Sequence, residues 1–87
     1  MTKTLMIDMS DGKWMVDVFS QANDSGVYDL IFPNTSTQVS LKESELYGFR
    51  YSLNAKQGTA FRILLDDIVL AEGEIDKTEM LTGNGVL

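Results

Sequence analysis

Hydrophobic and polar residues alternate along most of this chain with a period of two. Apolar residues occupy the odd positions from 5 to 9 and the even positions from 14 to 18, on either side of Ser10-Asp11-Gly12. This alternation is typical of strands with one buried face, and Gly12 suits the positive φ of a tight reversal. The first unit of the fold is therefore predicted to be a β-hairpin.

The same period predicts further strands along the rest of the chain. They are expected at 27–32, 39–41, 47–53, 61–65 and 68–75, with a short final strand or a loose end at 80–87. Residues 40–46 allow a second interpretation, because Ser40-Leu41-Lys42-Glu43 also fits a capping box at the start of one helical turn through Leu46. We favour a strand followed by a loop in this region.

A second hairpin is predicted around Asp66-Asp67, and its register is open. A two-residue turn carries Glu72 and Glu74 toward the core, whereas a one-residue slip buries apolar residues instead, namely Val69, Ala71 and Ile75. We therefore expect a bulge near Gly73. Residues 58–75 resemble hairpins found in many sandwich folds, including immunoglobulin-like, C2-like and carbohydrate-binding modules. This resemblance implies a sandwich and indicates no single family.

The spacing of these strands indicates an all-β fold. Seven or eight short strands at intervals of about ten residues are typical of a small antiparallel β-sandwich or a partly open barrel, here with at most one short helical turn. The 87 residues are expected to form one acidic domain, 1–87, with the small core that this length allows.

Histidine and cysteine are both absent from the chain. Their absence excludes a histidine-based hydrolytic triad, a zinc site built on thiolates or imidazoles, a disulfide framework and a redox pair. A pair of carboxylates remains possible as catalytic machinery, as in glycosidases, but so short a chain offers little room for both a cleft and a sugar. We expect no enzyme activity and no cofactor.

The chain is acidic throughout, with 13 acidic and 7 basic residues and a net charge of −6. Such a charge disfavours direct binding to nucleic acid or to an anionic membrane, and it favours a basic partner protein. The first residues do not build the apolar region of a secretion signal, and no apolar run is long enough to span a bilayer. We therefore expect a cytoplasmic protein.

Acidic residues are expected to gather at one end of the domain. If successive strands simply run up and down, alternate connections fall at the same end, and five carboxylates then face one lysine, Lys42. These carboxylates are Asp24, Glu43, Glu45, Asp66 and Asp67. We predict that they form the partner-binding surface. Calcium is an alternative occupant, but the chain has no Asp-x-Asp-x-Asp-Gly loop, and we expect no metal site.

The first three predicted strands also carry apolar residues on the face opposite their main apolar set: Met6, Met15, Phe19 and Ile31. A sheet that is apolar on both faces is either covered on both sides or forms an interface. In a domain of this size we expect the cover to be a second copy of the chain, in a homodimer with twofold symmetry.

Together these expectations indicate a non-enzymatic protein-binding module. The leading hypothesis is an acidic inhibitor or immunity-type protein, encoded by a phage or plasmid, that blocks a basic surface of a nuclease or another nucleic-acid-binding effector. The first alternative is a structural or assembly subunit, such as a phage capsid or tail component, that uses the apolar second face. The second alternative is a carbohydrate-binding or calcium-binding accessory module.

Overall fold

The computed structural model of this chain describes residues 2–20, 25–42 and 45–87. These residues form no helix and eight strands: β1 (Thr2–Met9), β2 (Lys13–Ser20), β3 (Ser25–Ile31), β4 (Ser36–Ser40), β5 (Tyr47–Asn54), β6 (Ala60–Leu65), β7 (Ile68–Glu74) and β8 (Met80–Val86). The strands pair antiparallel in two four-stranded sheets, with the orders β4-β1-β6-β7 and β3-β2-β5-β8. The predicted all-β sandwich is confirmed.

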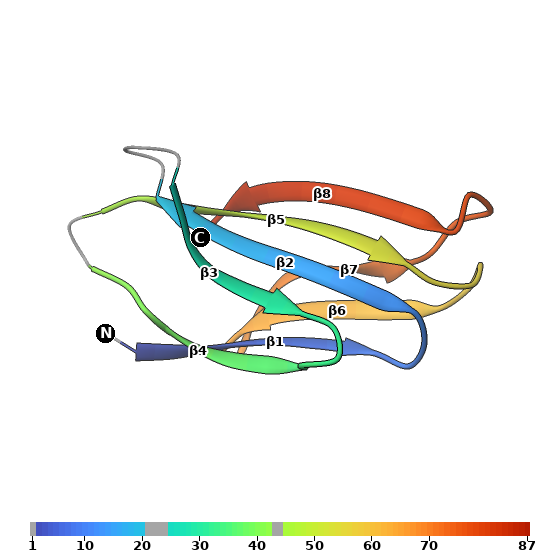
Figure 1. The fold of residues 1–87 in the computed structure, drawn as a ribbon, viewed down its shortest axis with the longest axis horizontal. Helices are drawn as coiled ribbons and strands as arrows, with labels where there is room; N and C mark the ends of the chain where they lie inside the picture. Colours follow the sequence, from blue (N-terminus) through green and yellow to red (C-terminus); the bar gives the residue numbers. More distant parts are fainter. Residues whose placement is uncertain (1, 21–24, 43–44) are drawn as a thin grey trace.

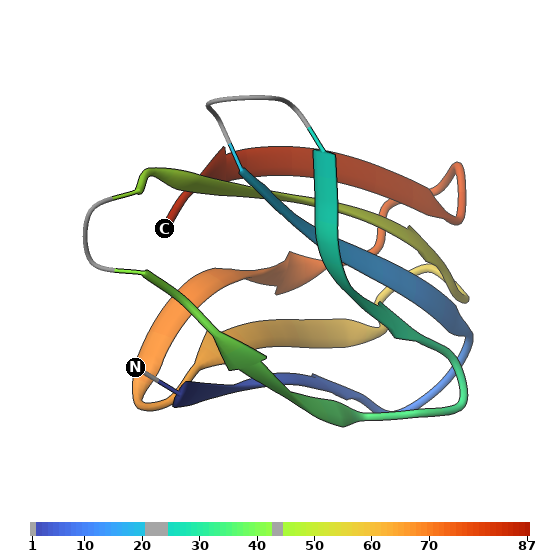
Figure 2. The same cartoon turned by 60° about the vertical axis from the view of Figure 1, so that its left-hand side comes forward.

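The two sheets lie face to face as separate layers and enclose the core, as Figure 2 shows. Alternate residues of each strand point inward, as the period of two requires. The residues that are at most 1% exposed come from six different strands: Leu5, Val16, Val18, Leu30, Val39, Leu53 and Ile63. Burying one such side chain contributes about 1.5–3 kcal/mol, so this shared core is the main source of stability.

The prediction of a hairpin between the first two strands is wrong. β1 pairs with β4 and β6, whereas β2 pairs with β3 and β5, so residues 10–12 carry the chain from one sheet to the other. Figure 1 shows this crossing at the end of the domain opposite the two termini. The inward residues of β1 and β2 therefore face each other across the core. Gly12 does adopt the expected positive φ, of 89°.

The second predicted hairpin, β6–β7, is present with its turn at Asp66-Asp67. The bulge that was expected near Gly73 lies instead at Leu70, where the register between the two strands shifts by one residue. Val69 precedes the extra residue and pairs with Leu64 on the outer face of the sheet, so it is exposed rather than buried, whereas Ile75 is buried as predicted.

The connection between β4 and β5 is a loop at its described positions, 41–42 and 45–46, and the helical turn is not seen there. Two tyrosine hydroxyls fix this region. The Tyr28 hydroxyl accepts a hydrogen bond from the Ser40 N–H at 3.0 Å, and the Tyr47 hydroxyl accepts one from the Lys42 N–H at 3.1 Å. The end of β4 and the first residues of the loop are thus tied to strands of the other sheet.

Glycines and aromatic rings together fill the side of the core next to β8. A Cβ on Gly83 would stand 2.5 Å from Cζ of Tyr51, and one on Gly85 would stand 2.8 Å from Phe49. The two rings belong to β5 and stack with their centroids 6.2 Å apart. Because the rings already occupy this space, β8 carries glycine at two of its three inward positions, and the third is Leu81.

Candidate functional site

Three of the five residues that were predicted to bind a partner lie at one end of the sandwich. The connections β4–β5 and β6–β7 lie at the left-hand end in Figure 1, together with the two termini. We call this end the pocket pole and define it by residues 3, 41–42, 45, 47, 49, 65–70 and 86–87, which include the lining of a pocket. Glu45, Asp66 and Asp67 lie here, whereas Asp24 and Glu43 fall outside the described residues.

Asp66 is bound into the sheet that contains β1 and β6. Its backbone N–H donates to the Thr4 carbonyl at 2.8 Å, and its Oδ1 accepts a hydrogen bond from the Thr4 N–H at 2.8 Å. Asp66 has a positive φ of 53°, a conformation that aspartate tolerates better than most residues do. One oxygen of this carboxylate therefore has a role in the fold.

Glu45 is held by two neighbours. Its Oε2 accepts a hydrogen bond from the Tyr47 hydroxyl at 3.1 Å, and its Oε1 lies 4.0 Å from Nζ of Lys42. Lys3 also lines the pocket, because β1 begins at this end of the domain. The described part of the pocket pole thus carries two lysines, Lys3 and Lys42, beside three carboxylates, Glu45, Asp66 and Asp67.

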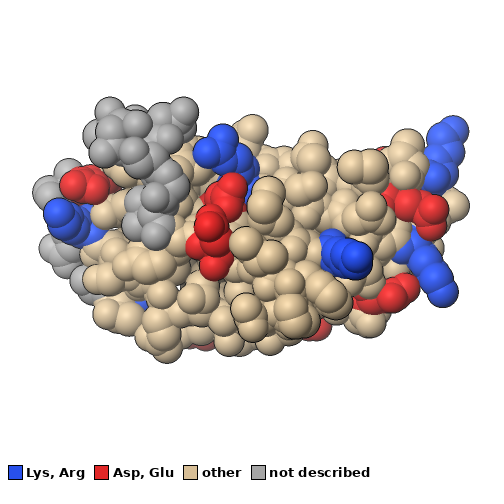
Figure 3. Space-filling view, in the orientation of Figure 1, with Lys and Arg blue, Asp and Glu red and all other residues tan. Residues whose placement is uncertain are grey.

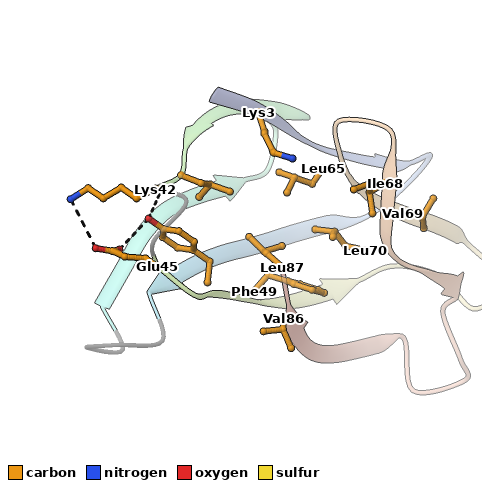
Figure 4. Close-up of a pocket in the computed structure, with 12 residues that line it drawn as sticks. Lys3, Lys42, Glu45, Phe49, Leu65, Ile68, Val69, Leu70, Val86 and Leu87 are labelled. Carbon is orange, nitrogen blue, oxygen red and sulfur yellow. Dashed lines mark hydrogen bonds and ion pairs between the residues drawn. The ribbon is translucent and has the colours of Figure 1, made fainter. Parts of the chain in front are cut away.

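The pocket is mainly apolar and has a volume of about 430 Å³. Its apolar lining comes from segments far apart in the sequence: Leu41, Phe49, Leu65, Ile68, Val69, Leu70, Val86 and Leu87. Figure 4 shows Leu65, Leu70 and Leu87 gathered around one space, with Lys3 beside it. Pockets of this kind accept an apolar group, and a few polar groups at the margin set its orientation.

Large apolar side chains are exposed around this pocket. Ile68 and Val86, which line it, are 58% and 65% exposed, and Leu46, next to Glu45 in the chain, is 69% exposed. Single exposed apolar residues are normal, but several around one cavity mark a binding surface. The alternation pattern did not indicate this cluster, because it left the register of the second hairpin open and allowed either a short final strand or a loose end at 80–87.

The residues predicted to form a dimer interface lie on two different sheets. Met6 is on the outer face of β1, whereas Met15, Phe19 and Ile31 belong to β2 and β3. Met15 pairs with Ile31, and the two are 43% and 48% exposed. Phe19 is half-buried, with Cζ of Arg50 4.8 Å from its ring centroid. The expectation of one sheet apolar on both faces is therefore wrong, because the chain changes sheets between β1 and β2.

An aspartate pair lies in the middle of the outer face formed by β2, β3 and β5. Asp17 is the cross-strand neighbour of Asp29 and of Arg50, and its Oδ2 lies 3.7 Å from Nε of Arg50. A hydrogen bond with Asp29, partial burial and the negative charge of Asp29 raise the pKa of Asp17 to about 6, against the opposing charge of Arg50. Figure 3 shows acidic and basic side chains together in the middle of a face that is otherwise mostly uncharged.

Asp17→Asn is expected to stabilise the fold at pH 7 and to have little effect at pH 4. The pKa of about 6 in the folded chain lies above the ordinary value of 3.8, so folding favours the protonated carboxyl. That stabilisation is complete below pH 3.8 and is lost as the pH rises through 6, whereas asparagine does not ionise and avoids the loss. Thermal unfolding across this pH range should show the variant gaining a few degrees on the wild type. A difference in Tm that stays constant with pH would contradict the raised pKa.

Among the described residues, no three acidic side chains lie close enough together to hold a metal ion. The same part of the chain contains no helix with the length and apolar character needed to cross a membrane. The chain matches no protein-family model, no curated protein and no solved structure. Its function has to be inferred from its residues and their geometry.

Proposed function

We propose that this chain is a non-enzymatic protein-binding module of the inhibitor or immunity type, and that it contacts its partner through the pocket pole. The observation that carries this proposal is the group of exposed apolar side chains around the pocket, with Ile68 and Val86 at its rim. An apolar centre within a charged margin is the usual composition of a protein interface. Lys42 and Glu45 supply such a margin on one side of the pocket.

The partner in this proposal is a basic protein that inserts an apolar side chain into the pocket. A net charge of −6 attracts a basic protein and speeds its approach. A pocket of about 430 Å³ has room for one large apolar side chain, which is how interfaces are commonly anchored. A nuclease or another effector that grips nucleic acid presents a basic surface of this kind, and blocking it requires no chemistry from the inhibitor.

Two isoleucine substitutions test this proposal against the assembly alternative. Ile68 lies at the pocket pole and is 58% exposed, whereas Ile31 lies on the outer face of β3 and is 48% exposed. Ile68→Asp and Ile31→Asp make the same chemical change and the same change in net charge. A partner captured from the native host and purified is titrated against the wild type and both variants by biolayer interferometry, and circular dichroism checks that each variant is folded.

Ile68→Asp is expected to raise the Kd at least about 30-fold, as the loss of an anchor residue does, whereas Ile31→Asp should change it less than about threefold. The association rate of the wild type should fall as the salt concentration rises. If Ile31→Asp abolishes binding and Ile68→Asp does not, the sheet face is the working surface and the proposal is refuted. Binding that neither substitution weakens refutes it as well.

A further inference from the structure

Three of the four edge strands of this sandwich have features that protect them from pairing with another strand. Sheet edges expose unpaired backbone groups, and proteins protect them with charges, bulges or cover. β7 carries Glu72, Glu74 and a bulge. β3 is bulged against β2 and carries Asp29. β4 is only five residues long, and the Ser40 N–H and carbonyl at its end are both within hydrogen-bond distance of the Tyr28 hydroxyl.

The fourth edge, β8, has none of these features. From Met80 to Val86 it contains no charged residue and no proline, and it pairs with β5 in one uninterrupted register. Figures 1 and 2 show β8 as the outermost strand of its sheet. This edge is therefore suited to accept another strand.

The hydrogen bonds that flank the β5–β8 ladder identify the unpaired backbone groups of β8. The Leu87 N–H donates to the Tyr47 carbonyl at 2.9 Å, and the Ala55 N–H donates to the Glu79 carbonyl at 3.1 Å. Bonded pairs alternate along an antiparallel ladder, so the odd-numbered residues of β8 bond to β5 and the even-numbered residues point their N–H and C=O away from it. These residues are Met80, Thr82, Asn84 and Val86, and the Met80 carbonyl already accepts a hydrogen bond from the Thr78 hydroxyl at 3.1 Å.

We propose that two copies of this chain dimerise by antiparallel pairing of β8 with β8, around a twofold axis at Gly83. In this register Thr82 of one copy lies opposite Asn84 of the other, and Met80 lies opposite Val86. Met80 and Val86 are 55% and 65% exposed in the single chain, so the pairing covers apolar side chains at both ends of the strand. The β3-β2-β5-β8 sheet of one copy and the same sheet of the other then form one continuous sheet across the dimer.

A second copy fits this edge because β8 is complementary to itself. In this register the outward N–H groups of one β8 face the outward carbonyl groups of the other. It also matches apolar with apolar and neutral polar with neutral polar side chains. No charge on β8 repels its twin, whereas Glu72 and Glu74 keep the neighbouring edge of the other layer apart. The inference does not rest on the proposed function. Val86 belongs to both surfaces, but the variants that test the dimer are at Thr82 and Asn84, which do not line the pocket at the pocket pole.

Three double variants test both the dimer and its register. Thr82→Lys/Asn84→Lys and Thr82→Glu/Asn84→Glu each place like charges opposite one another at two points across the axis. Thr82→Lys/Asn84→Glu places a lysine opposite a glutamate at the same two points. The third variant keeps the net charge of the wild type, which lies between the net charges of the other two variants. If overall charge alone governed dimerisation, the dissociation constant of the third variant would therefore lie between theirs.

Sedimentation velocity from micromolar to millimolar concentration measures dimerisation. The wild type and the lysine–glutamate variant are expected to have dissociation constants within about threefold of each other, and both like-charge variants should dimerise at least about tenfold more weakly. Thermal unfolding checks that every variant is folded. A wild type that is monomeric throughout overturns the proposal, as does a dimer that neither like-charge variant weakens. A lysine–glutamate variant as weak as the like-charge variants also overturns it, because the register is then different.

Discussion

Replacing Gly12 by alanine is expected to remove at least about 3 kcal/mol from the free energy of unfolding. Gly12 has a φ of 89°, at which alanine is strained. A Cβ here would also overlap the backbone carbonyl of Asn54 and would stand 2.5 Å from Cβ and 2.8 Å from Cα of Ala55. Backbone atoms cannot move aside as a flexible side chain can, so the crossing between β1 and β2 would have to open.

Gly58→Ala is the matched control for this experiment. Gly58 has nearly the same φ, 87°, but no heavy atom of another part of the chain lies within 4 Å of the position of its Cβ. This variant should lose only the cost of the strained backbone, about 1–2 kcal/mol. Urea unfolding of both variants, followed by the fluorescence of the single tryptophan, Trp14, measures the difference. Equal losses would mean that the crossing has room for a side chain, contrary to the packing around Gly12.

Ile63→Ala is expected to cost about 2–5 kcal/mol. Ile63 is fully buried in β6, between β1 and β7, and its truncation leaves a cavity that two packed sheets can only partly fill. The total stability of a domain of this length is roughly 4–13 kcal/mol, so the variant should melt well below the wild type. Ile31→Ala makes the same change at a side chain that is 48% exposed and should cost less than about 1 kcal/mol.

Thermal unfolding followed by circular dichroism compares the two isoleucine variants directly. Because Ile31 and Ile63 have the same intrinsic strand preference, that preference cancels, and the difference in Tm reports burial. Similar melting temperatures for the two variants would contradict the assignment of Ile63 to the core and of Ile31 to the outer face.

The strands of this fold could be predicted because each of them has one inner and one outer face. Leu5 and Ile7 in β1, and Phe49 and Leu53 in β5, point inward whichever sheet the strand joins. A period of two needs no knowledge of the neighbouring strand. The positions of the strands and the turn at Asp66-Asp67 therefore follow from local sequence alone.

The pairing of β1 and β2 could not be predicted in the same way. Leu5 and Val16 are both buried, and they would be buried equally in a hairpin, where they share a face, and in a crossing, where they face each other. Ser10-Asp11-Gly12 suits either reversal, because either can use a glycine with positive φ. Contacts of β1 with strands that come much later, β4 and β6, decide between the hairpin and the crossing.

The candidate site could be predicted in its location but not in its chemistry. Strands that run up and down bring Glu45 and Asp66 to one end of the domain. Whether a carboxylate is available there depends on distant atoms, such as the Thr4 N–H that Asp66 binds. Ile68 pairs with the buried Leu65, so the alternation of residues gave no sign that Ile68 itself is 58% exposed.

The central position of β1 has a consequence for synthesis of the protein in the cell. β1 leaves the ribosome before either strand that flanks it, since Leu5 pairs with Thr37 of β4 and with Leu65 of β6. Until residues 60–65 have emerged, β1 lacks one of its two neighbouring strands, and the side chains of Leu5, Ile7 and Met9 cannot be buried as they are in the folded domain. Late closure of this kind makes the yield of folded protein sensitive to translation speed and to chaperone supply, even though the finished domain is small.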